Sequence, residues 1–361
     1  MGICGKDNII SNNKKYSKHN KTTIQNIEIK SKGLNNIGNS CYMNSFLQIL
    51  FHCPNFLKEL NDVNNKYNLE KSLIKSIIDL SQHPNEKEYL YSIKNFMKNA
   101  SNEYEDYTQN DSQEFGKDLI NEIITYIKNI KGYNDYSQSI NDNDSEIITN
   151  NKKKEKYKHF IDKYQNDSII LENMFEVNEC IIAFDNSNIS NLIFNTSFDI
   201  ELNFPTNTNN GYFKKYSLEE LFEYKYINSY NNYESINKNN EKKTKNKIIK
   251  LCKLPKILII SIVRAINNRN LNKSLLTYPE ILNLKKYIDK DLITLNSEGK
   301  NNYKYKLFAI NEKSGPNESL GHYYCYINIE SEWFLFSDKN VEKSNLNFTS
   351  KKVVGLFYKQ L

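Results

Sequence analysis

Residues 33–45 read GLNNIGNSCYMNS, and this stretch governs the interpretation of the whole chain. Its glycines allow a tight turn whose backbone can approach a ligand. The turn delivers Cys41 to a run of apolar residues at helical spacing, closed by Pro54, so we expect a helix directly after Cys41. Unpaired amides and the dipole at a helix start favour a thiolate, the form of cysteine that attacks carbonyl carbons. A lone cysteine in this setting is more often a buried structural residue, so the interpretation needs support from the rest of the chain.

The same stretch resembles the cysteine box of the ubiquitin-specific proteases, and it meets every fixed position of the pattern Gly-Leu-x-Asn-x-Gly-x-x-Cys-Tyr-x-Asn-Ser. Six later stretches are similar to motifs of this family, in the family's order: QNDSQEF at 109–115, LPKIL at 254–258 with Arg264, YPEIL at 278–282, GHYYCY at 321–326, the segment 333–341, and LFY at 356–358. One short motif would be weak support. Seven in the correct order across residues 33–361 identify the chain as a member of the family.

This resemblance implies both a fold and an activity. The fold is α+β, the papain-like cysteine protease fold, with a helical thumb over residues 33–130, fingers from the middle of the chain and an antiparallel β palm from residue 250 onward. The activity is that of a deubiquitinating thiol hydrolase, which cleaves the isopeptide bond after the C-terminal glycine of ubiquitin. Ubiquitin and ubiquitinated proteins would then be its partners.

The resemblance also assigns the reacting groups. Cys41 would be the nucleophile, and His322 would take its proton and later return one to the leaving lysine amine. An isolated histidine would more often be a surface or packed residue, and the separation of 322 − 41 = 281 residues requires the fold to bring the pair together. Asn36 occupies the place of the family's oxyanion-stabilising asparagine, although an asparagine that only shapes the turn is the structural alternative.

The third member of the triad departs from the family pattern. The position that usually holds Asp or Asn is Ser337, and Asp338 follows it. Ser337 could accept the imidazole N–H as a neutral partner, or Asp338 could supply the carboxylate that fixes the tautomer and stabilises imidazolium. We favour Asp338 because a charged acceptor makes the stronger hydrogen bond.

The second motif concerns substrate binding. In the family this box holds the extended C-terminal tail of ubiquitin by hydrogen bonds and acidic contacts, which implies such a role for Gln109, Asp111, Gln113 and Glu114. Asp111 and Glu114 also have the spacing of a helix capping box, so a purely structural role is the alternative. Tyr323 would line the narrow channel for the tail glycines.

Hydrophobic periodicity predicts helices first and a sheet afterwards. Amphipathic patterns over 69–78 and 115–127 indicate helices, and the apolar run 257–263 after Pro255 indicates a buried central strand. Four later segments have strand patterns and are close enough in sequence to pair antiparallel: 303–310, 323–329, 333–336 and 353–358. This order of elements is an α+β plan.

Polar, Lys- and Asn-rich segments set the expected domain boundaries. We expect a flexible leader over residues 1–30 and a catalytic domain over 31–361, with disordered insertions near 131–168 and 228–247. Acylation of Gly2 and Cys4 would anchor the chain to a membrane, but Lys6 stands where the acylation motif has Ser or Thr. No apolar run approaches the roughly 18 residues that cross a bilayer, so we expect a cytoplasmic location, with a nuclear one also open.

The cysteines and charges exclude other classes. Six cysteines in 361 residues do not resemble a disulfide scaffold, which implies a reducing compartment. The chain lacks the Cys-x-x-Cys pairs that hold zinc in the family's fingers, so we expect no metal and no other cofactor, and packing of 169–184 and 194–204 must support the fingers. The net charge of +6 comes largely from short lysine runs typical of solvated loops, so we expect no nucleic-acid partner.

Two other functions stay open at this stage. A ubiquitin-binding pseudoenzyme would keep the pocket while Ser337 leaves His322 poorly oriented. An isopeptidase for a ubiquitin-like modifier would perform the same chemistry on another substrate.

Overall fold

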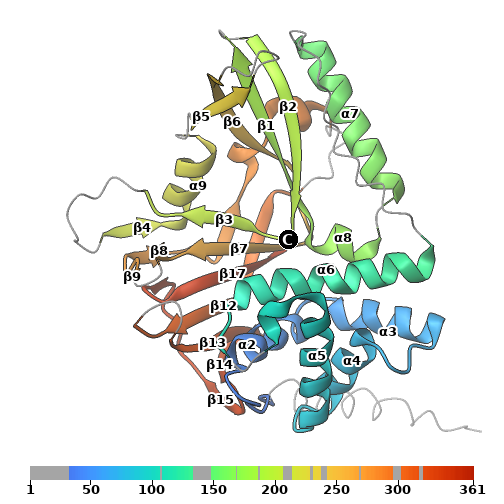
Figure 1. Ribbon diagram of the computed structural model, residues 1–361. Helices are drawn as coiled ribbons and strands as arrows, with labels where there is room; N and C mark the ends of the chain where they lie inside the picture. The colour runs from blue at the N-terminus through green and yellow to red at the C-terminus, as the bar shows by residue number, and fades with distance from the viewer. Residues whose placement is uncertain are drawn as a thin grey trace, which may run out of the picture.

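A computed structural model describes residues 32–105, 108–132, 148–167, 169–185, 188–205, 214–227, 231–236, 242–267, 270–295, 302–316 and 320–361. Figure 1 shows three regions, which we call the thumb (helices between residues 41 and 131), the palm (an eight-stranded sheet) and the fingers (a four-stranded sheet). The thumb lies at the lower right, the palm at the lower left and the fingers at the top. The leader expected over residues 1–30 lies outside the described residues.

The thumb is built from α-helices and one 3-10 helix: α2 (Cys41–Phe51), α3 (Phe56–Tyr67), α4 (Leu73–Gln82), α5 (Lys87–Ala100), η1 (Asn102–Tyr104) and α6 (Ser112–Lys131). Every residue of α2 from Cys41 to Leu50 is buried, so this helix is the centre of the thumb. The predicted apolar stripe of α6 is buried from Phe115 to Ile127. Periodicity alone did not reveal α3, which buries only Phe56 and Leu60 because most of its residues are polar.

The palm joins strands in the order β15-β14-β13-β12-β17-β7-β3, with β11 also paired to β12. Their bounds are β3 (Ile200–Asn203), β7 (Ile257–Val263), β11 (Ile281–Asn283), β12 (Lys304–Ser314), β13 (His322–Ile329), β14 (Glu332–Ser337), β15 (Asn340–Lys343) and β17 (Val353–Gln360). The antiparallel pairing predicted for the four C-terminal strands is confirmed, since β12 pairs with β13 and β17, and β13 pairs with β14.

The position of β7 between two hydrophobic cores explains why its sequence is apolar throughout. Ile257 and Ile259 belong to the core shared with the thumb, whereas Leu258 and Ile260 belong to the core on the opposite face of the sheet. Successive side chains of a strand point to opposite faces, so a strand covered on both faces has no solvent side for polar residues.

The fingers join strands in the order β2-β1-β6-β5. The strands are β1 (Val177–Asp185), β2 (Asn188–Ser197), β5 (Asn231–Ile236) and β6 (Lys242–Lys253), and the associated helices are α7 (Asn150–Asp167), α8 (Ile170–Phe175) and α9 (Leu218–Tyr226). The prediction of disorder is therefore wrong for the described parts of both insertions, which contain α7, β5 and the start of β6. The remaining parts lie outside the described residues.

Helix α7 lies beside the fingers (Figure 1). Most of its residues are polar, but a few are buried and hold the helix in place. Phe160 stacks on Phe194 of β2 at a centroid distance of 4.4 Å. The ammonium of Lys153 lies 2.8 Å from Asp289 and 3.0 Å from Asp291. Tyr157 is also buried and meets Phe194 edge-on at 5.7 Å, so one lysine and two aromatic rings fix a helix whose other residues are mostly polar.

Five short strands remain: β4 (Lys215–Ser217), β8 (Ala265–Asn267), β9 (Asn270–Leu271), β10 (Leu275–Thr277) and β16 (Thr349–Ser350). Two short helices lie against the helices of the fingers: η2 (Lys285–Tyr287) contacts α9, and α10 (Lys290–Leu295) contacts α7. None of the helices in the described part of the chain is both long and apolar enough to cross a bilayer.

Candidate active site

The turn before α2 places Cys41 as the first residue of that helix. The Asn36 Oδ1 atom accepts hydrogen bonds from the backbone N–H groups of Gly38 (2.9 Å) and Ser40 (3.3 Å). Gly38 has a φ of 104°, a backbone conformation that a side chain would strain. The side chain of Asn36 therefore shapes the turn, and its amide nitrogen remains available for other partners.

Strand β13 brings His322 to this helix start. The backbone N–H of Tyr323 lowers the pKa of the Cys41 thiol. Gln109 Nε2 lies 3.6 Å from the same sulfur and 2.6 Å from the carbonyl oxygen of Gly321. The residues on both sides of His322 are thus tied to Cys41 or to its hydrogen-bond partner. In the part of the chain that the structure describes, no hydrogen bond joins Cys41 to His322 directly.

The imidazole of His322 is oriented by Ser337. Its Nε2 atom lies 2.8 Å from the hydroxyl of Ser337 at the end of β14, and this leaves Nδ1 as the nitrogen that can exchange a proton with a neighbouring sulfur. The preference for Asp338 as the direct acceptor is therefore wrong. Asp338 follows the strand with a φ of +50°, and this left-handed conformation turns its carboxylate away from the imidazole.

The Asp338 carboxylate instead holds two amides. Its Oδ2 accepts from Asn36 Nδ2 at 2.9 Å, and its Oδ1 accepts from Asn44 Nδ2 at 2.8 Å. Asn36 has a second N–H that can point toward a reacting carbonyl oxygen. A charged acceptor thus fixes the one side chain that the family resemblance assigns to oxyanion binding.

The backbone of Asp338 is also held in place by direct contacts with the segment before α2. The N–H of Leu34 donates to the Asp338 carbonyl at 2.9 Å. Gly33 approaches so closely that a Cβ atom there would lie 2.3 Å from that carbonyl oxygen. The glycine at the start of the cysteine box is therefore required by a close backbone contact with the palm.

Burial raises the pKa of the Cys41 thiol above that of an ordinary cysteine. The Tyr323 N–H lowers it, Asp338 raises it through its negative charge, and Gln109 lowers it, but desolvation is the largest effect. The sequence-based expectation that the helix start favours a thiolate is thus outweighed in the free protein.

This direction predicts how Cys41 is alkylated. Because a thiol with a raised pKa is protonated at neutral pH, the rate of alkylation by iodoacetamide should rise about tenfold per pH unit from pH 6 toward pH 9. Intact-mass measurements on the protein and on Cys41→Ser report the rate at this site. A rate that is already maximal at pH 6 and flat above it would show a stable thiolate and contradict this assignment.

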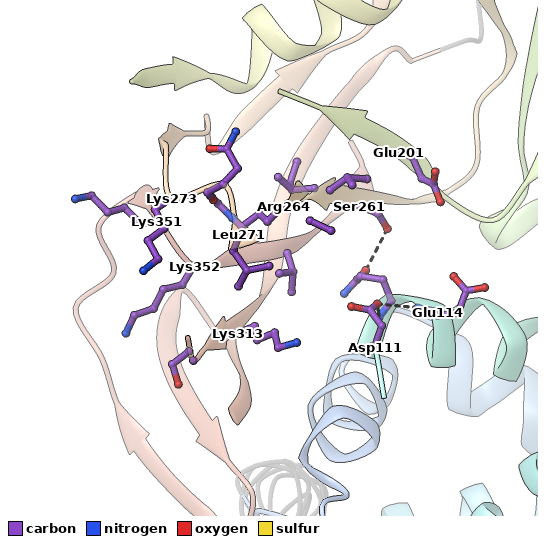
Figure 2. A pocket seen from close by; sticks show the side chains of 18 of the residues that line it. Asp111, Glu114, Glu201, Ser261, Arg264, Leu271, Lys273, Lys313, Lys351 and Lys352 are labelled. Carbon is purple, nitrogen blue, oxygen red and sulfur yellow. Dashed lines mark hydrogen bonds between the residues drawn. The ribbon is translucent and has the colours of Figure 1, made fainter. Parts of the chain in front are cut away.

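A pocket of about 410 Å³ opens between α6 and the ends of β3 and β7 (Figure 2). Three of the residues predicted to bind the tail line it, namely Asp111, Gln113 and Glu114, whereas Gln109 and Tyr323 do not. Figure 2 shows carboxylates on one wall and lysines on the other: Asp111, Glu114 and Glu201 against Lys273, Lys313, Lys351 and Lys352.

Asp111 has both a structural and a pocket position. Its Oδ1 accepts from the backbone N–H groups of Gln113 (2.8 Å) and Glu114 (3.1 Å), so it caps α6 as predicted. Its Oδ2 accepts from the hydroxyl of Tyr323 at 3.0 Å. Tyr323 is buried and braces Asp111 from the palm, and Glu114 forms an ion pair with Lys117 rather than closing the capping box.

Arg264, the last residue of the predicted strand motif, joins three segments at the pocket rim. Its guanidinium donates to the carbonyls of Val353 (2.7 Å), Asn272 (2.9 Å), Ser274 (3.0 Å) and Ser350 (3.4 Å). Burial lowers the pKa of Arg264 to about 10. This side chain is a brace for the loops, because its hydrogen bonds all go to backbone oxygens.

Sequence reasoning missed several residues of the site. Asn44 is a fixed position of the cysteine box, and that position was the available signal for its bond to Asp338. Lys117 and Glu201 line the pocket wall but belong to no motif, so no sequence signal pointed to them. Within the described residues no group of three or more His, Cys, Asp or Glu side chains is arranged to hold a metal ion.

A cysteine at a helix start and a histidine at the start of a strand in a mainly antiparallel sheet form the arrangement of the papain-like thiol hydrolases. The model of the ubiquitin carboxyl-terminal hydrolase family matches residues 32–358. The chain therefore belongs to that family, and the resemblance inferred from the seven motifs is confirmed.

Individual relatives are more distant. The chain is 34% identical over 104 residues to ubiquitin carboxyl-terminal hydrolase 4 of Arabidopsis thaliana, which covers 27% of this chain and 28% of that protein. It is 39% identical over 56 residues to ubiquitin carboxyl-terminal hydrolase 1 of Homo sapiens, covering 16% of this chain and 7% of that protein. The matches thus span less than a third of the length of these relatives.

Solved structures share the fold. One chain of the SAGA Ubp8/Sgf11/Sus1/Sgf73 DUB module bound to ubiquitin aldehyde is similar with a TM-score of 0.66 at 18% identity, over 96% of this chain and 74% of that one. The module solved as Ubp8-Sgf11-Sgf73-Sus1 gives 0.64 at 18%, over 93% and 69%. The predicted α+β fold is confirmed by this similarity.

Proposed function

We propose that this protein is a cysteine deubiquitinase that hydrolyses the isopeptide bond after the C-terminal glycine of ubiquitin. The observation that carries the proposal is the position of Gln109, whose Nε2 lies 3.6 Å from the Cys41 sulfur and 2.6 Å from the carbonyl oxygen of Gly321, the residue before His322. Membership of the ubiquitin carboxyl-terminal hydrolase family supports the substrate. The pocket lined by Asp111, Gln113 and Glu114 supports the binding of a peptide, and Cys41 and His322 lie outside its lining.

The first half of the reaction forms a thioester. His322 Nδ1 takes the Cys41 proton as the sulfur attacks the carbonyl carbon of the terminal glycine. The second N–H of Asn36 donates to the oxyanion while Asp338 holds the amide in place. Protonation of the lysine amine by His322 then breaks the C–N bond and releases the substrate protein.

The second half regenerates the enzyme. His322 removes a proton from water, and the resulting hydroxide attacks the thioester carbonyl. The C–S bond breaks, ubiquitin leaves with a free carboxylate, and the sulfur recovers its proton from His322. Ser337 keeps the imidazole oriented through both halves, because its hydroxyl oxygen can accept a hydrogen bond from Nε2–H.

Ubiquitin carrying a C-terminal electrophile tests this proposal. The protein should form a covalent adduct whose mass equals the sum of the two chains, less any leaving group. Cys41→Ala should form none, and Cys53→Ala is the matched control, since Cys53 is also a buried cysteine of the thumb. Tryptic mapping then identifies the modified cysteine.

The other outcomes separate the competing functions. Tight binding of ubiquitin without an adduct would indicate a pseudoenzyme. Neither binding nor adduct, together with a Cys41-dependent adduct to another ubiquitin-like modifier, would indicate that modifier as the substrate. Either result would refute the proposal for ubiquitin.

A further inference from the structure

Lys117 reaches across the acidic wall of the pocket from the second turn of α6. Its ammonium lies 3.0 Å from Glu114, 3.0 Å from Glu201 and 3.9 Å from Asp199. Glu114 belongs to α6, whereas the two other carboxylates come from β3 and the residue before it. Lys117 therefore links α6 and β3 across the pocket wall by ion pairs with Glu114 and Glu201, which are labelled in Figure 2.

The ammonium is held more firmly than an ordinary surface lysine. Only 22% of the Lys117 side chain is exposed, while 54% of Glu114 and 53% of Glu201 are exposed. Burial lowers the pKa of Lys117, but the pull of Asp199, Glu114 and Glu201 outweighs it and leaves the pKa raised. Lys117 thus stays charged across the physiological pH range, with its two exposed carboxylate partners facing the pocket.

The pocket wall is acidic in composition but partly neutralised in the free protein. Asp111, Glu114, Lys117 and Glu201 all line the pocket. Asp111 is already engaged by the amides of α6 and the hydroxyl of Tyr323. The carboxylates left to receive a cationic ligand are therefore Glu114 and Glu201, and Lys117 already contacts both.

We propose that Lys117 is a specificity-determining residue that competes with a cationic side chain of the substrate tail for Glu114 and Glu201. This inference deepens the proposed function, because it concerns the tail that enters the same site. A tail with a positive charge at this point must take the carboxylates from Lys117, whose ammonium can retreat toward Asp199. Lys117 thereby weakens the binding of a cationic tail and leaves the binding of a neutral tail unchanged, so it sets how strongly the site prefers a cationic tail.

The test compares variants in steady-state hydrolysis of ubiquitin bearing a C-terminal fluorogenic group. Lys117→Met should lower KM roughly two- to fivefold, the range set by partly exposed ion pairs, with kcat unchanged. Lys117→Arg keeps the positive charge and should have the same KM as the wild-type protein. Lys286→Met is the matched control, because Lys286 pairs with Glu223 at 2.7 Å outside the pocket lining.

A binding measurement separates this inference from the proposed function. In the Cys41→Ala background, fluorescent peptides ending in Arg-Gly-Gly and Ala-Gly-Gly are titrated. Lys117→Met should strengthen binding of the arginine peptide alone by the same factor. If the wild-type chain never turns over ubiquitin but this shift occurs, the proposed function fails and the competition between cations stands.

Opposite results would overturn the inference. One is a higher KM in Lys117→Met, which would make Lys117 a direct contact for an acidic group of the substrate. Another is equal strengthening for both peptides, or no change in either measurement. Lys117→Gln, which removes the charge but keeps a polar amide, replaces Lys117→Met if the latter melts at a lower temperature.

Discussion

Asp338→Asn should lower kcat about a hundredfold, although Asp338 does not touch the imidazole of His322. The substitution turns one carboxylate oxygen into an NH2 group, so only one of the N–H donors of Asn36 and Asn44 keeps its acceptor and the charge that held both is lost. Asn36 cannot flip its amide to compensate, because its Oδ1 already accepts from the turn before Cys41. Loss of one positioned oxyanion donor costs about 10²–10³ in kcat. Hydrolysis of fluorogenic ubiquitin measures the loss, with KM nearly unchanged.

Asparagine is the informative replacement because it tolerates the left-handed backbone at this position better than alanine does. Ser337→Ala is the comparison, since it removes a neutral hydrogen bond to His322 worth roughly tenfold in rate at most. The assignment is wrong if Asp338→Asn keeps full turnover while Ser337→Ala loses a hundredfold.

Gly33→Ala should damage stability and turnover together. The new Cβ would lie 2.3 Å from the carbonyl oxygen of Asp338 and 2.4 and 2.5 Å from backbone atoms of Lys339. Backbone atoms cannot rotate away as a side chain can, so the Leu34 to Asp338 hydrogen bond must break or lengthen. We expect the free energy of unfolding to fall by about 1–3 kcal/mol. We expect kcat/KM to fall by roughly the same factor as in Asp338→Asn, because the carboxylate moves with its backbone.

Denaturant unfolding and fluorogenic hydrolysis measure the two effects. Gly132→Ala is the matched control: Gly132 has a φ of 71°, but a Cβ there meets nothing within 4 Å. That variant should lose roughly 1 kcal/mol of stability through backbone strain and keep its activity. Full activity in a folded Gly33→Ala protein would show that the contact with Asp338 does not position the site.

The sequence was informative where each residue carried a local signal. The run of apolar residues in β7 and the stripe of α6 follow from burial on two faces and on one face, respectively. The resemblance pointed to Cys41 and His322 through motifs 281 residues apart, a separation that no periodicity argument could have bridged. Asp111 was found by its capping position, which depends only on neighbouring residues.

Other features depend on contacts between distant elements and could not be read from local pattern. Helix α7 looks disordered because its stability comes from Lys153 with Asp289 and from Phe160 with Phe194, partners that lie elsewhere in the chain. The choice between Ser337 and Asp338 depended on one backbone angle, φ +50° at Asp338, which sent the stronger acceptor toward the asparagines. The protonated state of Cys41 depended on how much protein covers it, and helix geometry alone argued the opposite way.

The guanidinium of Arg264 has a consequence for how this rim can evolve. It recognises only main-chain oxygens of the segments around Asn272, Ser274, Ser350 and Val353, so it imposes a path on those segments but no side-chain identity. Substitution of the lysines that these segments carry at the rim should therefore change the charge of the pocket wall without changing the path of the loops. Lysine in place of Arg264 would loosen this arrangement, because a single ammonium cannot span four carbonyls that belong to two segments.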